Sequence, residues 1–263
     1  MSDNKVFFID RSINASSFPF KVSEAKGSEP GFSYFFAPSH DLALLHFTET
    51  GNRFVMYQGY RVPNTSDSLR LVYQWLVGDS AIPVHGGTIS WGAKTALVSN
   101  AGGSGKSSLI SSAVLSGAKT TGDDFGLLQT EKNSGQFIAW SQFQTFKLAP
   151  DSPSRNLVMS TPLFEANGKS VFSFEQEFPG SVEVHQEIDV IIIPMVGDKR
   201  SSRLASLEET IKHVAISSSG MALERARTTL ALVELCRRTP SIFATFTRNS
   251  QENVLFLKDL LAK

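Results

Sequence analysis

A run of small residues ahead of a lysine and a serine is the part of this sequence best suited to chemistry. The run consists of Asn100, Ala101, Gly102, Gly103, Ser104 and Gly105. Glycines lack a Cβ atom, so a loop rich in them lets successive backbone N–H groups close around phosphate oxygens. Lys106 then offers a positive charge to terminal phosphates, and Ser107 offers a hydroxyl to Mg²⁺. The pattern predicts a nucleotide site that uses ATP and Mg²⁺.

The loop meets the signature G-x-x-x-x-G-K-[ST] at every position except the first, where Asn100 replaces glycine. Asparagine tolerates left-handed backbone angles best after glycine, so we expect the turn to survive. An apolar strand at 96–98 precedes the loop, and a helix is expected to follow it. The residues predicted to bind the nucleotide are Ala101, Gly102, Gly103, Ser104, Gly105, Lys106, Ser107 and Ser108. The alternative is an ordinary glycine-rich turn that opens a helix.

Two adjacent carboxylates, Asp123 and Asp124, are the second chemical feature. A helix over 106–115 makes about three turns, Gly117 fits its C-terminal cap, and 118–122 is long enough to return as a strand. We therefore expect the aspartates beside the glycine-rich loop. There one can hold Mg²⁺ while the other accepts a proton from an attacking hydroxyl. The alternative is a solvated Asp-Asp turn.

The long apolar strand expected at 190–196 does not supply the acidic motif. In motor and switch NTPases an acidic residue usually stands at the end of such a strand, whereas here Asp189 precedes it. We therefore interpret this strand as buried core and the earlier aspartate pair as the metal and base site.

The order of these features resembles the HPr kinase/phosphorylase-like family, which shares the phosphoenolpyruvate carboxykinase type of P-loop fold. That family carries a His-Gly pair on a strand, then a P-loop, one helix and an Asp-Asp pair. The matching residues here are His85-Gly86, 100–107 and Asp123-Asp124. Looser similarity extends over roughly residues 80–263 and includes 140–150 and 235–246.

The resemblance implies a role for each matching residue. Lys106 would contact the β- and γ-phosphates, Ser107 would bind Mg²⁺, and Asp123 would act as the general base. Asp124 would bind the metal or orient its neighbour, and His85 would lie beside the phosphates or the aspartates. Members of the family often form oligomers, which makes a homo-oligomer an expectation here as well.

A basic loop and three departures complete the comparison with the family. Lys199, Arg200 and Arg203 lie where stand-alone members carry basic residues. We expect Arg200 on the charge of the transferred phosphoryl group or on an acidic substrate, and a solvated surface turn is the alternative. Ala101 and Ser108 stand where HPr kinases carry acidic residues, and the Glu-Ile-Arg-Gly phosphorylase motif is missing. These departures argue against reverse phosphorolysis and against HPr itself as the substrate.

The expected architecture is α/β, a mixed sheet flanked by helices with a β-rich N-terminal layer. Residues 1–78 predict a β-rich region that ends in a helix and packs on the core, and 79–263 predict the ATP-binding domain. The expected N-terminal elements are strands at 6–9, 32–36, 42–47 and 54–57 and a helix near 66–76. Farther along, Ser206 and Glu209 form a capping-box pattern, and helices are expected at 221–237 and 253–261.

The composition restricts the class of protein. The chain has 263 residues, 41% apolar and 19% charged, which is typical of a globular protein with a sizeable core. Its 25 basic and 25 acidic residues cancel, which argues against nucleic acid as a partner. Cys236 is the only cysteine and no apolar run is long enough to span a membrane, so we expect a cytoplasmic protein. The histidines show no zinc-binding spacing.

Three functions remain open from the sequence. The first is an ATP- and Mg²⁺-dependent kinase that phosphorylates a serine on a small protein or precursor peptide. The second is a nucleotide-binding sensor or assembly protein with little transfer activity, which the residues at 101 and 108 favour. Phosphorylation of a small molecule, or phosphoenolpyruvate chemistry, is the weakest of the three, because the expected additional metal-ligand cluster of His and Lys is not evident.

Overall fold

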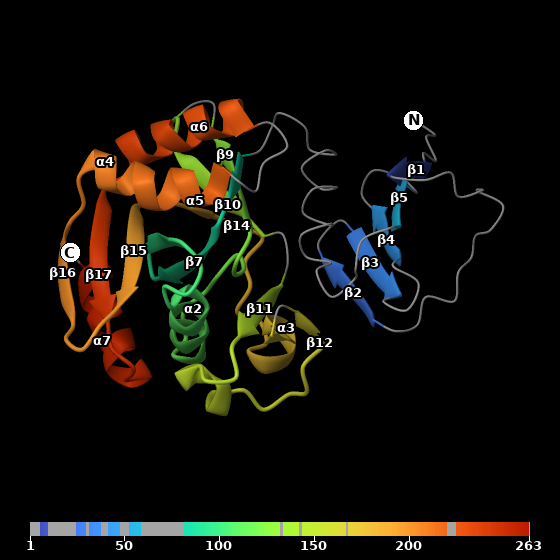
Figure 1. Cartoon of the computed structure of the whole chain (residues 1–263), viewed down its shortest axis with the longest axis horizontal. Helices are drawn as coiled ribbons and strands as arrows, with labels where there is room; N and C mark the ends of the chain where they lie inside the picture. The colour runs from blue at the N-terminus through green and yellow to red at the C-terminus, as the bar shows by residue number, and fades with distance from the viewer. Residues whose placement is uncertain are drawn as a thin grey trace.

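The computed structural model describes residues 82–262 apart from 132–133, 142–143, 167 and 220–224, together with five strands closer to the N-terminus (Figure 1). The helix expected near 66–76 lies outside the described residues.

The five N-terminal strands form one sheet. They are β1 (Val6–Ile9), β2 (Ala25–Glu29), β3 (Phe32–Ala37), β4 (Leu42–Phe47) and β5 (Arg53–Gln58). Their order is β1-β5-β4-β3-β2, with β1 parallel to β5 and the other neighbours antiparallel. The four aromatic-rich strands are confirmed, whereas the short polar strand β2 is one that its sequence does not predict. Packing of this sheet on the core stays a prediction.

A second five-stranded sheet forms the centre of the rest of the chain. Its strands are β7 (Gly86–Trp91), β8 (Lys94–Ser99), β15 (Val190–Val196), β16 (Ser201–Leu204) and β17 (Ser241–Phe246). The order is β16-β17-β15-β8-β7, in which β15 runs parallel to both β8 and β17 and the outer strands are antiparallel. Residues Ile191–Ile193 of β15 are fully buried, which confirms the expectation of a core strand.

Helices cover both faces of this central sheet (Figure 1). They are α2 (Lys106–Leu115) and α7 (Ser250–Leu261) on one face, and α4 (Leu207–Thr210), the π-helix η6 (Ile211–Ala215), α5 (Ile216–Ser219) and α6 (Arg225–Arg238) on the other. Side chains alternate along a strand, so Ile192 packs with α2 and α7 while Ile191 and Ile193 pack with η6 and α6. The mixed α/β arrangement is confirmed, and the finer assignment to a P-loop fold type stays a prediction.

Two smaller antiparallel sheets complete the described part of the chain. One is ordered β14-β10-β9-β6 and the other β11-β13-β12. The strands are β6 (Ile82–Val84), β9 (Gly126–Thr130), β10 (Phe137–Trp140), β11 (Thr145–Leu148), β12 (Phe164–Ala166), β13 (Lys169–Ser173) and β14 (His185–Glu187). Short helical turns are η5 (Pro153–Leu157) and α3 (Phe174–Glu177).

Several local expectations can be compared with these elements. Helix α2 has the predicted bounds, Gly117 follows it with φ of 92°, and Ser206 with Glu209 forms the capping box. Residues 118–122 are not a regular strand: their ladder pairing consists of two isolated bridges, Ser90 with Lys119 and Thr120 with Val182. Helix α7 begins three residues before its predicted start of 253, because Asn249 rather than a later residue caps it.

Among the described residues, no helix combines the length and the apolar character that crossing a membrane requires.

Candidate functional site

The glycine-rich loop joins the end of β8 to the start of α2. Gly103 and Gly105 have φ of 81° and 89°, values that residues with a Cβ atom rarely adopt. Gly105 is the N-cap residue of α2. A Cβ atom on Gly105 would also lie 3.2 Å from Val196 Cγ2. No described side chain caps the N-terminus of α2, so the first-turn N–H groups remain available to an anion.

Asn100 holds the loop to the central sheet. Its side-chain nitrogen donates to the Pro194 carbonyl at 2.8 Å, and its side-chain oxygen accepts from the Ala101 N–H at 2.7 Å. The same oxygen lies 3.0 Å from Nδ1 of His213. Among the described residues Asp124 is the one non-glycine with positive φ, so the expectation that Asn100 is tolerated for its left-handed backbone is wrong. Asparagine stands here because its amide makes these bonds.

We predict that restoring the signature glycine with Asn100→Gly destabilises the protein. The change removes the amide that satisfies the Pro194 carbonyl and the Ala101 N–H, and it adds backbone freedom to the unfolded chain. The free energy of unfolding should fall by about 1–3 kcal/mol, as for other buried hydrogen-bond losses. Urea unfolding of the variant and the wild type measures the difference, and a variant as stable as the wild type would refute the role given to Asn100.

Lys106 is folded back onto the loop that precedes it. Its Nζ donates to the carbonyls of Asn100 at 2.7 Å and Ala101 at 2.9 Å, and the residue is 5% exposed. Burial lowers the pKa of Lys106, and the nearby charges of Asp123 and Asp124 oppose that shift. An ammonium has three donors, so one remains for a ligand.

Asp123 is the buried member of the aspartate pair. It is 2% exposed, its Oδ2 accepts a long 3.4 Å hydrogen bond from the Lys147 N–H, and its Oδ1 has no hydrogen-bond partner among the described residues. Burial and the charge of Asp124 raise the pKa of Asp123, while the Ser107 hydroxyl and Lys106 partly oppose the rise. The carboxyl group is thus suited to taking up a proton.

Asp124 lies in the opposite electrostatic environment. It lines the cavity described below, its Oδ2 is 2.7 Å from Lys147 Nζ, and its Oδ1 is 3.4 Å from His85 Nε2. Burial alone would raise the pKa of Asp124, but the hydrogen bond from His85 and the charge of Lys147 hold it well below the usual range. This carboxylate therefore stays anionic. The pKa values of the two neighbouring aspartates are shifted in opposite directions, as for a general base beside a carboxylate that remains ionised.

His85 is placed beside Asp124 by hydroxyl groups at both ends of its backbone. Its N–H donates to Ser218 Oγ at 2.9 Å, and its carbonyl accepts from Ser99 Oγ at 2.7 Å. Two residues later, a Cβ atom on Gly87 would lie 2.1 Å from the Gly122 carbonyl oxygen. Glycine at this position lets β7 approach the backbone that carries the aspartates, and this contact brings His85 and Asp124 together.

The aspartate pair predicts two opposite pH dependences of stability. An acid with a raised pKa in the folded state destabilises that state as pH rises above its ordinary pKa of about 4, so Asp123→Asn should gain stability relative to wild type from about pH 4 upward. An acid with a lowered pKa stabilises the folded state above its ordinary pKa, and the effect is lost as pH falls. Asp124→Asn should therefore cost stability at neutral pH and progressively less below about pH 4.

Urea unfolding of both variants between pH 3 and pH 8 measures these slopes. Asp189→Asn is a control at an aspartate outside the cavity, since Asp189 precedes β15, accepts from the Thr95 N–H and pairs with Lys94. Two aspartate variants with the same pH slope would contradict the division within the pair.

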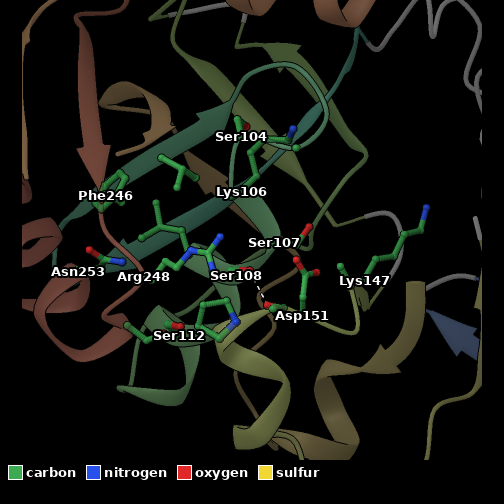
Figure 2. A pocket seen from close by; sticks show the side chains of 18 of the residues that line it. Ser104, Lys106, Ser107, Ser108, Ser112, Lys147, Asp151, Phe246, Arg248 and Asn253 are labelled. Carbon is green, nitrogen blue, oxygen red and sulfur yellow. Dashed lines mark hydrogen bonds between the residues drawn. The ribbon is translucent and has the colours of Figure 1, made fainter. Parts of the chain in front are cut away.

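A cavity of about 400 Å³ is lined both by the glycine-rich loop and by Asp124. Figure 2 shows side chains from the loop, from α2 and from the segment after β17 around this space. The lining residues with ionisable side chains are His85, Lys106, Asp124, Lys147, Asp151, Lys169 and Arg248. Seven of the eight residues predicted to bind the nucleotide line the cavity: Gly102, Gly103, Ser104, Gly105, Lys106, Ser107 and Ser108. The eighth, Ala101, is not among the lining residues. Asp123 lies behind the wall in contact with this lining.

Arg200 is not among the described residues that line the cavity. Its guanidinium lies 2.9 Å from the Glu252 carboxylate and donates to the Glu252 carbonyl at 3.1 Å. Arg203 is likewise bound to Glu209 and stacks over Phe243. The basic loop is thus tied to α7 and α4, and the role expected for Arg200 finds no support in its position.

Three cations in the cavity were not assigned by sequence reasoning: Lys147, Lys169 and Arg248. Arg248 follows β17, which is parallel to β15, and the carboxyl ends of parallel strands share one edge of a sheet with the loop after β8. A basic residue directly after a predicted strand is therefore the signal that could have identified Arg248. Lys147 and Lys169 come from a separate sheet, and no local pattern relates them to the loop.

Comparison with known structures finds a distant likeness. The HPr(Ser) kinase/phosphatase of Coxiella burnetii is similar with a TM-score of 0.40 and 12% identity, over 68% of this chain and 93% of that chain. No protein-family model and no curated protein sequence matches the chain. At this identity and TM-score the relationship is structural and distant, so any function has to be argued from the residues of the site itself.

Proposed function

We propose that the chain is an ATP- and Mg²⁺-dependent kinase that transfers the γ-phosphoryl group to a serine hydroxyl of a small protein or precursor peptide. The observation that carries the proposal is the divided aspartate pair. Asp123 has a raised pKa and Asp124 a lowered one, directly beside a glycine-rich loop with a buried lysine. A phosphate-binding protein without transfer activity has no need of a carboxyl group poised to accept a proton.

Binding of the triphosphate is supported by the unsatisfied groups of the loop. The first-turn N–H groups of α2, the remaining donor of Lys106 and the buried Ser104 hydroxyl, which has no partner among the described residues, all belong to the loop or to the helix that follows it. Buried polar groups are rarely left without a partner, so these donors favour an anionic ligand with several oxygens. The cavity has the size of a typical small-molecule site.

A magnesium ion fits the donors present. Mg²⁺ prefers oxygen ligands and is usually bound by one or two carboxylates together with substrate phosphates and water. The Ser107 hydroxyl and Asp124 are the predicted protein ligands, and both residues line the cavity. The described residues contain no cluster of three or more His, Cys, Asp or Glu that could hold a metal ion. When bound, the ion neutralises phosphate charge.

Each residue of the site has a separate role in the proposed phosphoryl transfer. Asp123 accepts the proton of the acceptor serine as its hydroxyl oxygen bonds to the γ-phosphorus, and the bond to the bridging oxygen breaks so that ADP leaves. Lys106 and the loop N–H groups hold the phosphates in place. Asp124 keeps its orientation through Lys147 and His85 and remains ionised, which maintains the negative charge beside the base.

Intact-mass measurement tests this function. The protein is incubated with ATP, Mg²⁺ and pools of small proteins and serine-containing peptides, and the expected result is the gain of one phosphate on a serine. An Asp123→Asn sample is the matched control and should gain phosphate at a rate lower by roughly 100-fold or more. Tight ATP binding without transfer to any acceptor would favour the sensor or assembly role, and a chain that does not bind ATP would refute both.

A further inference from the structure

Two of the three lysines that line the cavity have partners among the described residues. Lys106 directs two of its three donors to the carbonyls of Asn100 and Ala101. Lys147 forms the 2.7 Å ion pair with Asp124. Lys169 also lines the cavity, but its ammonium has no hydrogen bond or ion pair with any described residue. Lys169 is half-buried and lines the same cavity as Lys106, near enough for the two positive charges to repel.

Lys169 is placed there by a hairpin. It is the first residue of β13 and pairs with Ala166 at the end of β12, beside Gly168 with φ of 72°. Strand β13 also pairs with β11, which carries Lys147, and this sheet forms the wall nearest the aspartates. A half-buried lysine held beside another cation without a partner is unfavourable in the protein alone, because its charge is neither fully hydrated nor paired.

The position of a cation in the cavity determines which phosphate of a nucleotide triphosphate it can contact. The γ-phosphorus must lie beside the base during transfer, and the base stands on the β11 side, where the Lys147 N–H contacts Asp123. Arg248 follows β17, beside Phe246 and Asn253, so it comes from another part of the lining. Lys169 therefore belongs to the γ-phosphate end of the site.

We propose that Lys169 binds the terminal phosphate of the nucleotide and balances the charge of the transferred group, the role that the sequence suggested for Arg200. The inference rests on the proposed function for the identity of the ligand. A lysine that contacts only the third phosphate has a distinct signature: its loss weakens ATP binding and leaves ADP binding intact. Loss of a purely structural residue weakens both.

Calorimetric titration of ATP and of ADP, each with Mg²⁺, tests the assignment in wild type, Lys169→Met and Lys169→Arg. Methionine keeps the aliphatic stem of the lysine and removes the charge. We expect Lys169→Met to weaken ATP binding by roughly 10- to 100-fold, the effect of losing a charge-assisted hydrogen bond, with little change for ADP. Lys169→Arg should recover part of the loss. Lys199→Ala removes an exposed lysine outside the cavity lining and should bind both nucleotides as wild type does.

The outcomes separate this inference from the proposed function. Equal losses for ATP and ADP, or no loss, would overturn the assignment of Lys169 while leaving the kinase intact. A selective loss for ATP in a protein that phosphorylates no acceptor would uphold the assignment and refute the kinase. If wild type binds neither nucleotide, both proposals fail. Circular dichroism of each variant confirms that it is folded, and if Lys169→Met is not, the Lys169→Gln variant serves for the same titration.

Discussion

Lys106→Ala is expected to weaken ATP binding by about 100-fold and to abolish phosphoryl transfer. Lys106 is the buried cation of the loop, and the change removes both its contact with phosphate and the two hydrogen bonds that close the loop on Asn100 and Ala101. Each charge-assisted hydrogen bond of this kind is worth about 1.5–3 kcal/mol. Calorimetry for affinity and mass measurement for transfer give the two results.

Two controls separate charge from packing in this experiment. Lys106→Met retains the buried stem and should lose ATP binding almost as completely as the alanine variant. Lys94→Ala removes a lysine from the opposite end of β8, where it pairs with Asp189, and should bind ATP normally. Wild-type affinity and transfer in Lys106→Ala would refute the assignment of the loop as the phosphate site.

Asp123→Asn is expected to reduce transfer by roughly 100-fold or more while leaving nucleotide affinity nearly unchanged, the range for losing a general base. The amide keeps the shape of the carboxyl group but cannot take the serine proton. Because Asp123 is buried with a raised pKa, the neutral substitute should also fold at least as well near neutral pH. Single-turnover transfer and ATP titration measure the two effects separately.

A change in nucleotide affinity as large as the change in rate would indicate that Asp123 is chiefly a metal or phosphate ligand. Asp124→Asn is the informative companion, because it removes a permanently ionised carboxylate. That variant should raise the Mg²⁺ concentration needed for half-maximal activity. Transfer at the wild-type rate in Asp123→Asn would rule out the base assignment.

Features that depend on neighbouring residues were predictable from the sequence. The glycine-rich loop, the bounds of α2, the glycine after it and the capping box at Ser206 were all read from local patterns. Each of these elements is specified by backbone stereochemistry and by hydrogen bonds within a few residues. The apolar run of β15 was similarly clear, since a run of buried β-branched residues packs well only inside a sheet.

Only the tertiary structure decided which distant residues share the cavity. The strand order β16-β17-β15-β8-β7 and the separate sheet containing β11 and β13 bring Arg248, Lys147 and Lys169 to the loop, and they leave Arg200 paired with Glu252. No local spacing encodes such contacts, because they depend on how strands far apart in the chain are paired.

The aspartate pair shows most clearly which properties follow from the sequence and which follow from the tertiary structure. The sequence by itself determined that two carboxylates follow the loop by one helix. Their opposite pKa shifts arise from unequal burial and from contacts with His85 and Lys147, which the fold supplies. Adjacent residues of one type become chemically different because desolvation and charge act through space, and the tertiary structure alone sets those distances.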